Sequence, residues 1–141
     1  GGEVMCWGDN TRGQRGNGTG TGGSTPVAVT LTAAASTKAS PSASTLSSGE
    51  NHTCVLLADG RIDCWGAGDS GQIGNGAGDD QPLPADVTGL LPDVTGVSCG
   101  LAHSCALFET GTVHCWGDND AGQLGNGTND GSLVPVQVLC R

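Results

Sequence analysis

A motif that recurs around the three tryptophans, Trp7, Trp65 and Trp116, constrains this chain more than any other feature. Each tryptophan follows a cysteine directly, and each has a glycine five positions earlier. Each is also followed by a Gly-Gln pair that starts six positions later and an Asn-Gly pair that starts ten positions later. Matches at so many fixed offsets indicate a structural repeat, in which each unit is completed by its neighbours. The cysteines and glycines of the three copies are Cys6, Cys64, Cys115 and Gly2, Gly60, Gly111.

Turn chemistry predicts a hairpin at the centre of each complete copy. In CVLLADGRIDC, residues 58–60 match a three-residue loop that ends in a left-handed residue, which Gly60 supplies at low cost. Counting back from this loop places Cys54 opposite Cys64 at a non-hydrogen-bonded site, where Cα atoms are about 4.5 Å apart. That spacing lies at the close end of the range for disulfides. The third copy, with its loop ending at Gly111, predicts a second cross-strand disulfide between Cys105 and Cys115.

Two further strands are predicted in each copy. A strand that starts at a proline follows each Asn-Gly pair, at residues 26–31, 84–90 and 135–140. Another strand precedes each of the two histidines, His52 and His103, at residues 44–49 and 94–100. Four short antiparallel strands in a repeat of about 50 residues are typical of a β-propeller blade. We therefore predict an all-β fold made of propeller blades.

The combined pattern H-x-C-x-L…G-x-V-x-C-W-G…G-Q-x-G-N-G…P-V-x-V resembles the regulator of chromosome condensation repeat, and its cysteines resemble the secreted bacterial branch of that family. The resemblance implies a propeller, usually of seven blades, whose loop faces bind protein partners. This chain holds two full copies and one partial copy, too few for a closed ring of seven. We expect a single repeat domain over residues 1–141. It would consist of a partial blade at 1–31, an Ala/Ser/Thr-rich connection at 32–48, a second blade at 45–91 and a third blade at 92–141.

Charge and cysteine content narrow the function class. The chain has five Lys and Arg residues and a formal net charge of −9, which argues against a nucleic-acid partner and against an anionic membrane surface. No apolar run approaches the roughly 20 residues of a membrane span. Seven cysteines suggest disulfides formed in an oxidising compartment. We expect the protein to act outside the cell or at the cell surface; the periplasm would fit equally.

Metal binding is the alternative to disulfides as an explanation of the recurring spacing between histidine and cysteine. His52, Cys54 and Cys64 offer soft ligands at close range, as do His103, Cys105, His114 and Cys115. His114 and Cys115 are adjacent in a strand and point to opposite faces, so each group provides three ligands at best. Disulfides are therefore favoured, and His52 and His103 are expected to brace the strand entrance. The G-x-G-x-x-G at residues 66–71 lacks the following helix that a dinucleotide requires. The acidic stretch 118–120 lacks the glycine of a calcium loop. No cofactor, metal or catalytic residue is predicted.

The sequence thus predicts a non-enzymatic extracellular scaffold that binds a protein partner or copies of itself. We expect it to be part of a longer propeller or to assemble head to tail. Two different end surfaces that fit each other join successive copies into an open assembly. A metal-dependent or carbohydrate-binding extracellular domain remains the alternative. Three cysteines, Cys6, Cys99 and Cys140, are left without an assigned partner. Cys99 and Cys140 could bond to each other, and all three are candidates for bonds to another chain or segment. Glycan could be carried by the Ser/Thr-rich segment or by the sequons at Asn17, Asn51 and Asn126.

Overall fold

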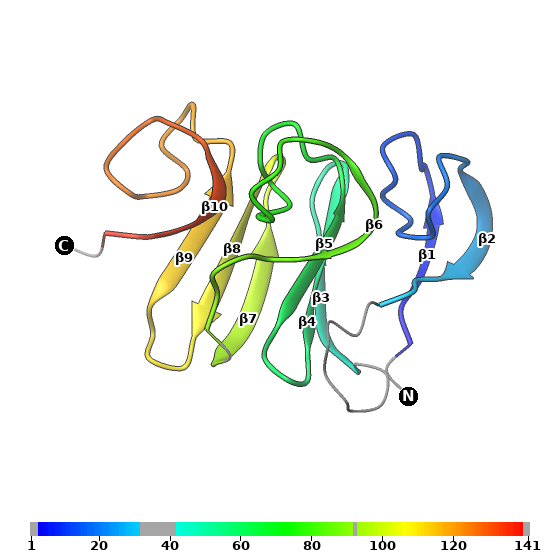
Figure 1. Cartoon of the computed structure of the whole chain (residues 1–141), viewed down its shortest axis with the longest axis horizontal. Coiled ribbons are helices and arrows are strands. Elements are labelled where there is room, and N and C mark those ends of the chain that lie inside the picture. Colours follow the sequence, from blue (N-terminus) through cyan, green and yellow to red (C-terminus); the bar gives the residue numbers. More distant parts are fainter. Residues whose placement is uncertain (1–2, 32–41, 92, 140–141) are drawn as a thin grey trace.

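Three antiparallel sheets stand side by side in the computed structural model, which describes residues 3–31, 42–91 and 93–139 (Figure 1). We call them blades 1, 2 and 3. Blade 1 contains β1 (Met5–Gly8) and β2 (Gly23–Ala28). Blade 2 contains β3 (Ala43–Ser48), β4 (His52–Leu57), β5 (Ile62–Gly66) and β6 (Gln81–Asp86). Blade 3 contains β7 (Val94–Cys99), β8 (His103–Phe108), β9 (Val113–Gly117) and β10 (Ser132–Gln137).

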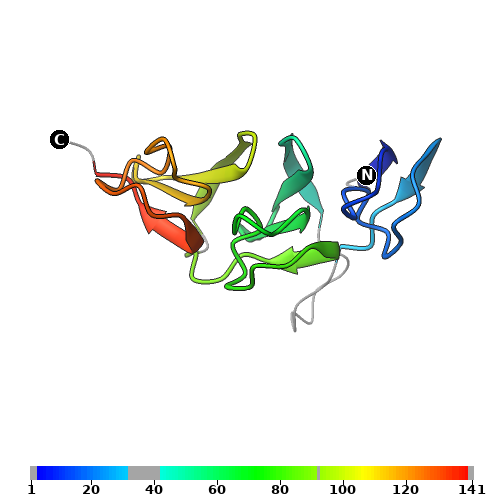
Figure 2. The same ribbon diagram turned by 90° about the horizontal axis from the view of Figure 1, so that it is seen from above.

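The order of strands within each sheet follows the sequence, so every connection inside a blade joins neighbouring antiparallel strands. Seen from above, the three blades form an arc (Figure 2). No helix that could cross a membrane occurs among the described residues. Gly2, Cys140 and residues 32–41 of the predicted connection lie outside those residues. The prediction of an all-β fold with four-stranded blades is confirmed for blades 2 and 3.

The central hairpins have the predicted register. Cys54 pairs with Cys64 across β4 and β5, and Cys105 pairs with Cys115 across β8 and β9. The loop between β4 and β5 closes with a hydrogen bond from the Gly60 amide to the Leu57 carbonyl, and Gly60 has a φ of 84°. This positive φ explains why glycine recurs at this point of the repeat.

The prediction that the fourth strand of each blade starts at its proline was wrong. β2, β6 and β10 each begin three residues before that proline, so Pro26, Pro84 and Pro135 lie inside the strands. In all three blades the register with the preceding strand shifts across this region. A proline has no amide hydrogen to donate to the ladder, and a bulge is one of the few places in a strand that tolerates it.

The hydrophobic core lies between blades, not within them. One cluster joins blade 1 to blade 2 and contains Val4, Val29, Val55, Leu57 and Trp65. The other joins blade 2 to blade 3 and includes Leu56, Ile62, Phe108 and Trp116 together with the Cys54–Cys64 disulfide. A sheet that buries its apolar faces only against its neighbours depends on them for stability.

Candidate functional site

The tryptophans of blades 2 and 3 each reach into the preceding blade and hydrogen-bond to its backbone. The Trp65 indole Nε1 donates to the carbonyl oxygen of Gln14 at 2.9 Å, and Trp116 Nε1 donates to the carbonyl of Gln72 at the same distance. Both tryptophans are fully buried. The Trp and Gly-Gln positions of the repeat therefore form one contact that recurs between successive blades.

The loop that receives each tryptophan is shaped by its own glutamine and glycine. The side-chain oxygen of Gln14 accepts a hydrogen bond from the Arg12 amide at 2.8 Å, which holds the loop in place. Two residues after the glutamine, a Cβ on Gly16 would lie 2.8 Å from Trp65 Nε1. On Gly74 it would lie 2.6 Å from Trp116 Nε1. Only glycine allows the indole to approach this closely, which explains why a glycine recurs two residues after the glutamine of each Gly-Gln pair.

Trp7 occupies the same position of the repeat but is 63% exposed. It lies on β1, which pairs with β2 on one side only among the described residues. Its equivalents β5 and β9 are each paired on both sides. The open side of β1 therefore presents unpaired backbone groups next to an exposed indole, a combination typical of a surface that accepts another strand.

A pocket of about 360 Å³ adjoins this open side, between blade 1 and blade 2. Its lining combines apolar side chains with polar groups and includes Met5, Cys6, Trp7, Leu46 and His52. Met5 and Leu46 are 43% and 51% exposed. The Cys6 thiol lies here unbonded, and burial is the main cause that raises its pKa. We call β1 and this pocket the β1 face. It is an exposed apolar surface next to a free strand edge.

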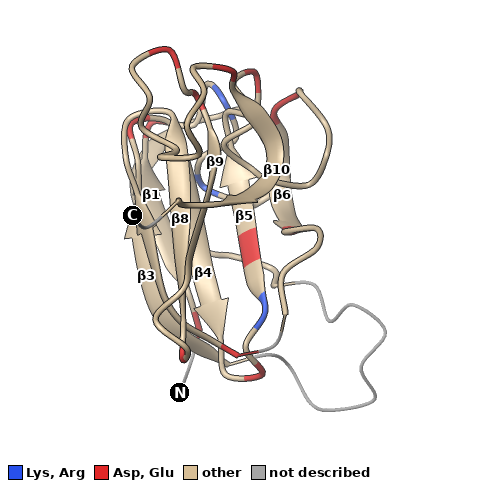
Figure 3. Ribbon diagram, turned by 90° about the vertical axis from the view of Figure 1, so that its left-hand side faces the viewer, with Lys and Arg blue, Asp and Glu red and all other residues tan. Residues whose placement is uncertain are grey.

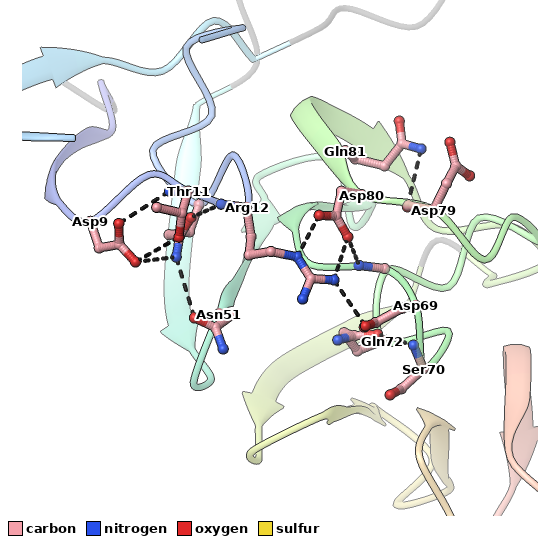
Figure 4. Close-up of polar contacts among 12 residues, drawn as sticks. Asp9, Thr11, Arg12, Asn51, Asp69, Ser70, Gln72, Asp79, Asp80 and Gln81 are labelled. Atoms are coloured by element: carbon pink, nitrogen blue, oxygen red, sulfur yellow. Dashed lines mark hydrogen bonds and ion pairs between the residues drawn. The ribbon is translucent and has the colours of Figure 1, made fainter. Parts of the chain in front are cut away.

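One arginine links the loops of blade 1 and blade 2 (Figure 4). The Arg12 guanidinium forms a two-pronged contact with the Asp80 carboxylate, in which Nη2 lies 2.7 Å from Oδ1, and reaches Asp69 at 3.0 Å. Its hydrogen bonds lower the pKa of both carboxyl groups. The sequence interpretation missed this contact. The only signal was a charged residue where the other copies have Ser70 and Ala121.

Acidic residues gather on the loops between the third and fourth strands of the blades (Figure 3). In blades 2 and 3 these loops carry three carboxylates each, and Arg12 neutralises part of the charge only at blade 2. This loop edge is therefore negative, in keeping with the net charge of the chain. The carboxylates are Asp9 in blade 1, Asp69, Asp79 and Asp80 in blade 2, and Asp118, Asp120 and Asp130 in blade 3.

His52 supports the turn between β3 and β4 and contacts blade 3. A Cβ added at Gly49 would lie 2.3 Å from its Cε1, so the ring fills the space beneath that turn. Its Nε2 lies 2.9 Å from the Ser104 hydroxyl. Burial lowers the pKa of His52 to about 4, so the ring is neutral at pH 7. His103 has the same relation to Gly100, where a Cβ would lie 2.1 Å from its Cε1. This geometry agrees with the bracing role expected for both histidines.

The two predicted disulfides are present. Cys54 is bonded to Cys64 with their Cα atoms 4.1 Å apart, and Cys105 is bonded to Cys115 with a Cα separation of 4.0 Å. Cys99 is unbonded and lies between blades 2 and 3, packed against the core there. The sequence did not indicate this location, because it depends on how two repeats pack together.

Buried asparagines hold the Asp/Asn-rich loops together. In blade 3 the Asn119 side chain is fully buried, donates to the carbonyls of Thr128 and Asp130 at 2.9 Å, and accepts from the Leu124 amide. Asn10 does the same in blade 1. The predicted sequon residues Asn17 and Asn126 each accept hydrogen bonds within these loops, which gives them a structural role.

Asp63 is a buried carboxylate that the sequence interpretation overlooked. It is fully buried on β5, and neither carboxylate oxygen has a hydrogen-bond partner among the described residues. Burial raises its pKa to about 6. The aligned residues are Met5 in blade 1 and His114 in blade 3, where His114 packs edge-on against Phe108 with ring centroids 4.9 Å apart.

Comparison with known families agrees with this geometry. A family model described as Regulator of chromosome condensation (RCC1) repeat matches residues 59–107 and 110–139, and a second model with the same description matches 44–72 and 94–123. The first model covers more than half of the chain. The chain belongs to the RCC1 repeat family. The resemblance stated from the sequence is thereby confirmed at the level of the repeat.

The RCC1 relatives are much longer than this chain. The chain is 33% identical to the human E3 ubiquitin-protein ligase HERC2 over 140 residues, which cover 97% of this chain and 3% of the relative. It is also 33% identical to the Ultraviolet-B receptor UVR8 of Arabidopsis thaliana over 95 residues, 66% of this chain and 22% of the receptor. The chain therefore spans no more than about a fifth of either of these two relatives.

Solved structures show the same fold. Prp20p of Saccharomyces cerevisiae matches 98% of this chain with a TM-score of 0.84 at 22% identity, and the match covers 34% of Prp20p. Human WBSCR16 matches 99% of the chain with a TM-score of 0.83 at 24% identity, over 35% of that protein. At such low identity these matches show the fold alone: a partial RCC1-type propeller that corresponds to about a third of each structure.

Proposed function

We propose that this chain is a non-enzymatic scaffold that works outside the cell, and that the β1 face binds another blade of the same repeat type. The observation that carries the proposal is the exposure of Trp7, which is 63%, against 0% for Trp65 and Trp116. The same residue type at the same repeat position is buried wherever a preceding blade covers it. The surface is therefore complementary to a Gln-Xaa-Gly loop like those that hold Trp65 and Trp116.

A partner with a free strand of the H-x-C type would add a strand as well as a loop, whereas a second copy of this chain offers the loop alone, because its β4 and β8 are paired on both sides. In blades 2 and 3 the equivalents of β1 are β5 and β9. The strand paired with each of them carries the pattern H-x-C, and its cysteine bonds to the cysteine that precedes the tryptophan. A strand of that type on the open side of β1 would meet Cys6. Strand addition of this kind satisfies the unpaired backbone groups of an edge and buries the apolar side chains beside it.

Relatives support a role in protein binding. The structure report on Prp20p describes its binding properties to Gsp1p and histones. The two disulfides and the scarcity of Lys and Arg favour an oxidising compartment and a partner other than nucleic acid. The acidic loop edge favours a partner surface with basic groups.

Light scattering on the purified chain tests the assembly. We expect the mass to rise with protein concentration, because the exposed Trp7 side of one copy can meet the open Gln123 loop of another. Trp7→Glu should reduce the mass to that of a monomer, because it places a charge in the buried contact. Leu91→Glu is the matched control, since Leu91 is 66% exposed but lies away from the β1 face. It should associate like the parent chain.

A parent chain that remains a compact monomer at every concentration would contradict the assembly. Intact mass after alkylation under non-reducing conditions tests the oxidised state separately. With seven cysteines and two disulfides, no more than three thiols should react. Four or more alkylated thiols in the purified chain would contradict the disulfide scheme and, with it, the argument for an oxidising compartment.

A further inference from the structure

The open side of β1 keeps the backbone shape with which blades 2 and 3 hold their own H-x-C strands. Gly8 has a φ of 105°, close to the 104° of Gly66 and the 109° of Gly117 at the aligned positions. A Cβ on Gly66 would lie 2.8 Å from the Cα of His52. A Cβ on Gly117 would lie 2.7 Å from the Cα of His103. A Cβ on Gly8 would come within 4 Å of no described residue beyond its chain neighbours, so there is room for a histidine backbone beside it.

The backbone amide that follows this glycine lacks the partner that its counterparts have. The Ala67 amide donates to the Asn51 carbonyl at 2.8 Å. The Asp118 amide donates to the Ala102 carbonyl at 2.9 Å. Both acceptors directly precede the histidine of an H-x-C strand. The aligned amide of Asp9 makes no such bond within residues 3–31, 42–91 and 93–139, and a strand added to β1 would bring its acceptor.

Cys6 lies where its two counterparts are bonded to an H-x-C cysteine. In blades 2 and 3 these bonded pairs have Cα separations of 4.1 and 4.0 Å. The same ladders place the histidine, two residues before its cysteine, opposite the glycine that follows the tryptophan. A strand in this register on β1 therefore sets its cysteine opposite Cys6 and its histidine opposite Gly8. Cys6 is partly exposed, unbonded and part of the pocket wall, so its sulfur can be reached there.

Blade 2 supplies a hydroxyl for the imidazole of such a strand. At the interface of blades 2 and 3 the Ser104 hydroxyl lies 2.9 Å from His52 Nε2. The repeat aligns Ser104 with Thr53, which lines the pocket beside Cys6. Thr53 is buried, and its hydroxyl lies 3.3 Å from that of Ser48. The interface of blades 2 and 3 is thus a template for what the pocket between blades 1 and 2 can hold.

We propose that the β1 face is a covalent docking site for a strand with the pattern His-Xaa-Cys on a partner polypeptide. The partner's cysteine forms a disulfide with Cys6, and its imidazole hydrogen-bonds to the Thr53 hydroxyl. This rests on the proposed function, in which the same face binds a blade of this repeat type, and adds which strand is recognised and how it is retained. A second copy of the chain does not supply the strand, because its own H-x-C cysteines are bonded and β4 and β8 are paired on both sides.

The bond forms by thiol–disulfide exchange. The partner's cysteine arrives as a mixed disulfide with a small thiol such as glutathione. The Cys6 sulfur attacks the partner's sulfur and bonds to it, and the small thiol leaves with the proton that Cys6 gave up. One disulfide replaces another, so no further oxidant is needed. Burial raises the pKa of the Cys6 thiol, so the reaction depends on a strand that is already held in place.

Peptide capture by the full, oxidised chain tests the site. The probe is a peptide with the sequence of residues 50–57, Glu-Asn-His-Thr-Cys-Val-Leu-Leu, whose cysteine carries glutathione. Intact mass against time gives the rate of adduct formation, and protease digestion locates the adduct. We expect one peptide per chain, bonded to Cys6, and formed at least about tenfold faster than with a scrambled peptide of the same composition.

Variants assign the two contacts. Cys6→Ser should abolish the adduct, whereas the matched control Cys99→Ser should form it at the parental rate. Thr53→Val keeps the size of the side chain and removes its hydroxyl, so capture should slow about fivefold. With a peptide in which alanine replaces histidine, Thr53→Val and the parent chain should react equally. Circular dichroism confirms that each variant keeps its strands.

The proposal is overturned if the scrambled peptide reacts as fast, if the adduct forms on a cysteine other than Cys6, or if Cys6 takes up glutathione in place of the peptide. A peptide with serine in place of cysteine separates this result from the proposed function. If that peptide binds reversibly to the parent chain while the cysteine peptide forms no disulfide, the covalent site is excluded and binding by the β1 face stands. Light scattering of the chain alone tests the Trp7 contact independently, because that contact needs no added strand.

Discussion

Blades 2 and 3 share the same repeat, yet their central strands have different environments. All six residues of β4 are buried, whereas β8 alternates between buried and partly or fully exposed positions. The cause is the neighbours: blade 2 has a blade on each side, and in the described residues blade 3 has one. The environment of a side chain in this family is set by the adjacent repeat as much as by its own.

The largest expected effect is the difference in stability lost when the buried Trp65 or the exposed Trp7 is removed. Trp65→Ala removes a fully buried indole and its hydrogen bond to Gln14, so we expect a loss of about 3–5 kcal/mol of unfolding free energy. Trp7→Ala removes an indole that is 63% exposed, and should cost the monomer less than about 1 kcal/mol. Urea denaturation of the two variants measures both values at a concentration where the chain is monomeric.

Equal losses in the two variants would contradict the comparison, because they would mean that Trp7 is as well covered in solution as Trp65. The difference in indole fluorescence between the parent chain and Trp7→Phe gives an independent reading of Trp7. It should report a solvent-exposed ring, and it should shift toward the blue as the chain associates through the β1 face.

The second prediction concerns Asp63, a buried carboxylate at a position where blade 3 has His114. Its pKa is about 6 in the folded chain, above the ordinary value of 3.8, so the folded state holds a proton that the unfolded chain releases. Stability is therefore lost as pH rises from about 4 to 6, and the full cost above pH 6 is about 3 kcal/mol. Asp63→Asn should recover up to that amount at pH 8 and change little at pH 4.

The control for this measurement is Asp93→Asn, which makes the same substitution at an exposed carboxylate. Urea midpoints at pH 4, 6 and 8 give the comparison. A stabilisation by Asp63→Asn that is the same at pH 4 and pH 8 would show that Asp63 does not stay protonated in the folded chain at low pH. His52 has the opposite sign, since its lowered pKa makes stability fall as pH drops below its ordinary value of 6.5.

Local features of the structure could be predicted from the sequence, because they depend on a few adjacent residues. Gly60 determines the hairpin loop, the loop determines the register, and the register places Cys54 opposite Cys64. The strand starts before Pro26, Pro84 and Pro135 were misplaced because a bulge hides the missing amide donor.

Contacts between blades could not be predicted, because they join residues that are far apart in the sequence, such as Trp116 and Gln72, which are 44 positions apart. Cys99 and Cys54 meet only because β7 packs beside β3 and β4, and Trp65 meets Gln14 only because blade 2 follows blade 1 in space. The repeat spacing predicts that neighbouring blades contact each other, but it does not predict which atoms make the contacts. The β1 face depends on this second kind of contact.

The smallest expected effect concerns Arg12, which joins the loops of blades 1 and 2. The aligned residue of blade 2, on the loop next to blade 3, is Ser70. The pair is partly exposed, so Arg12→Ala should cost about 0.2–1 kcal/mol, and less at high salt. Because Arg12 lowers the pKa of Asp69 and Asp80, its contribution is present above their ordinary pKa and is lost as pH falls through the lowered values. A double-mutant cycle with Asp80→Asn at pH 7, at low and at high salt, isolates the pair. A coupling energy that salt does not reduce would mean that packing, not charge, links the two loops, and blade 1 would then be joined to blade 2 in the same way as blade 2 to blade 3.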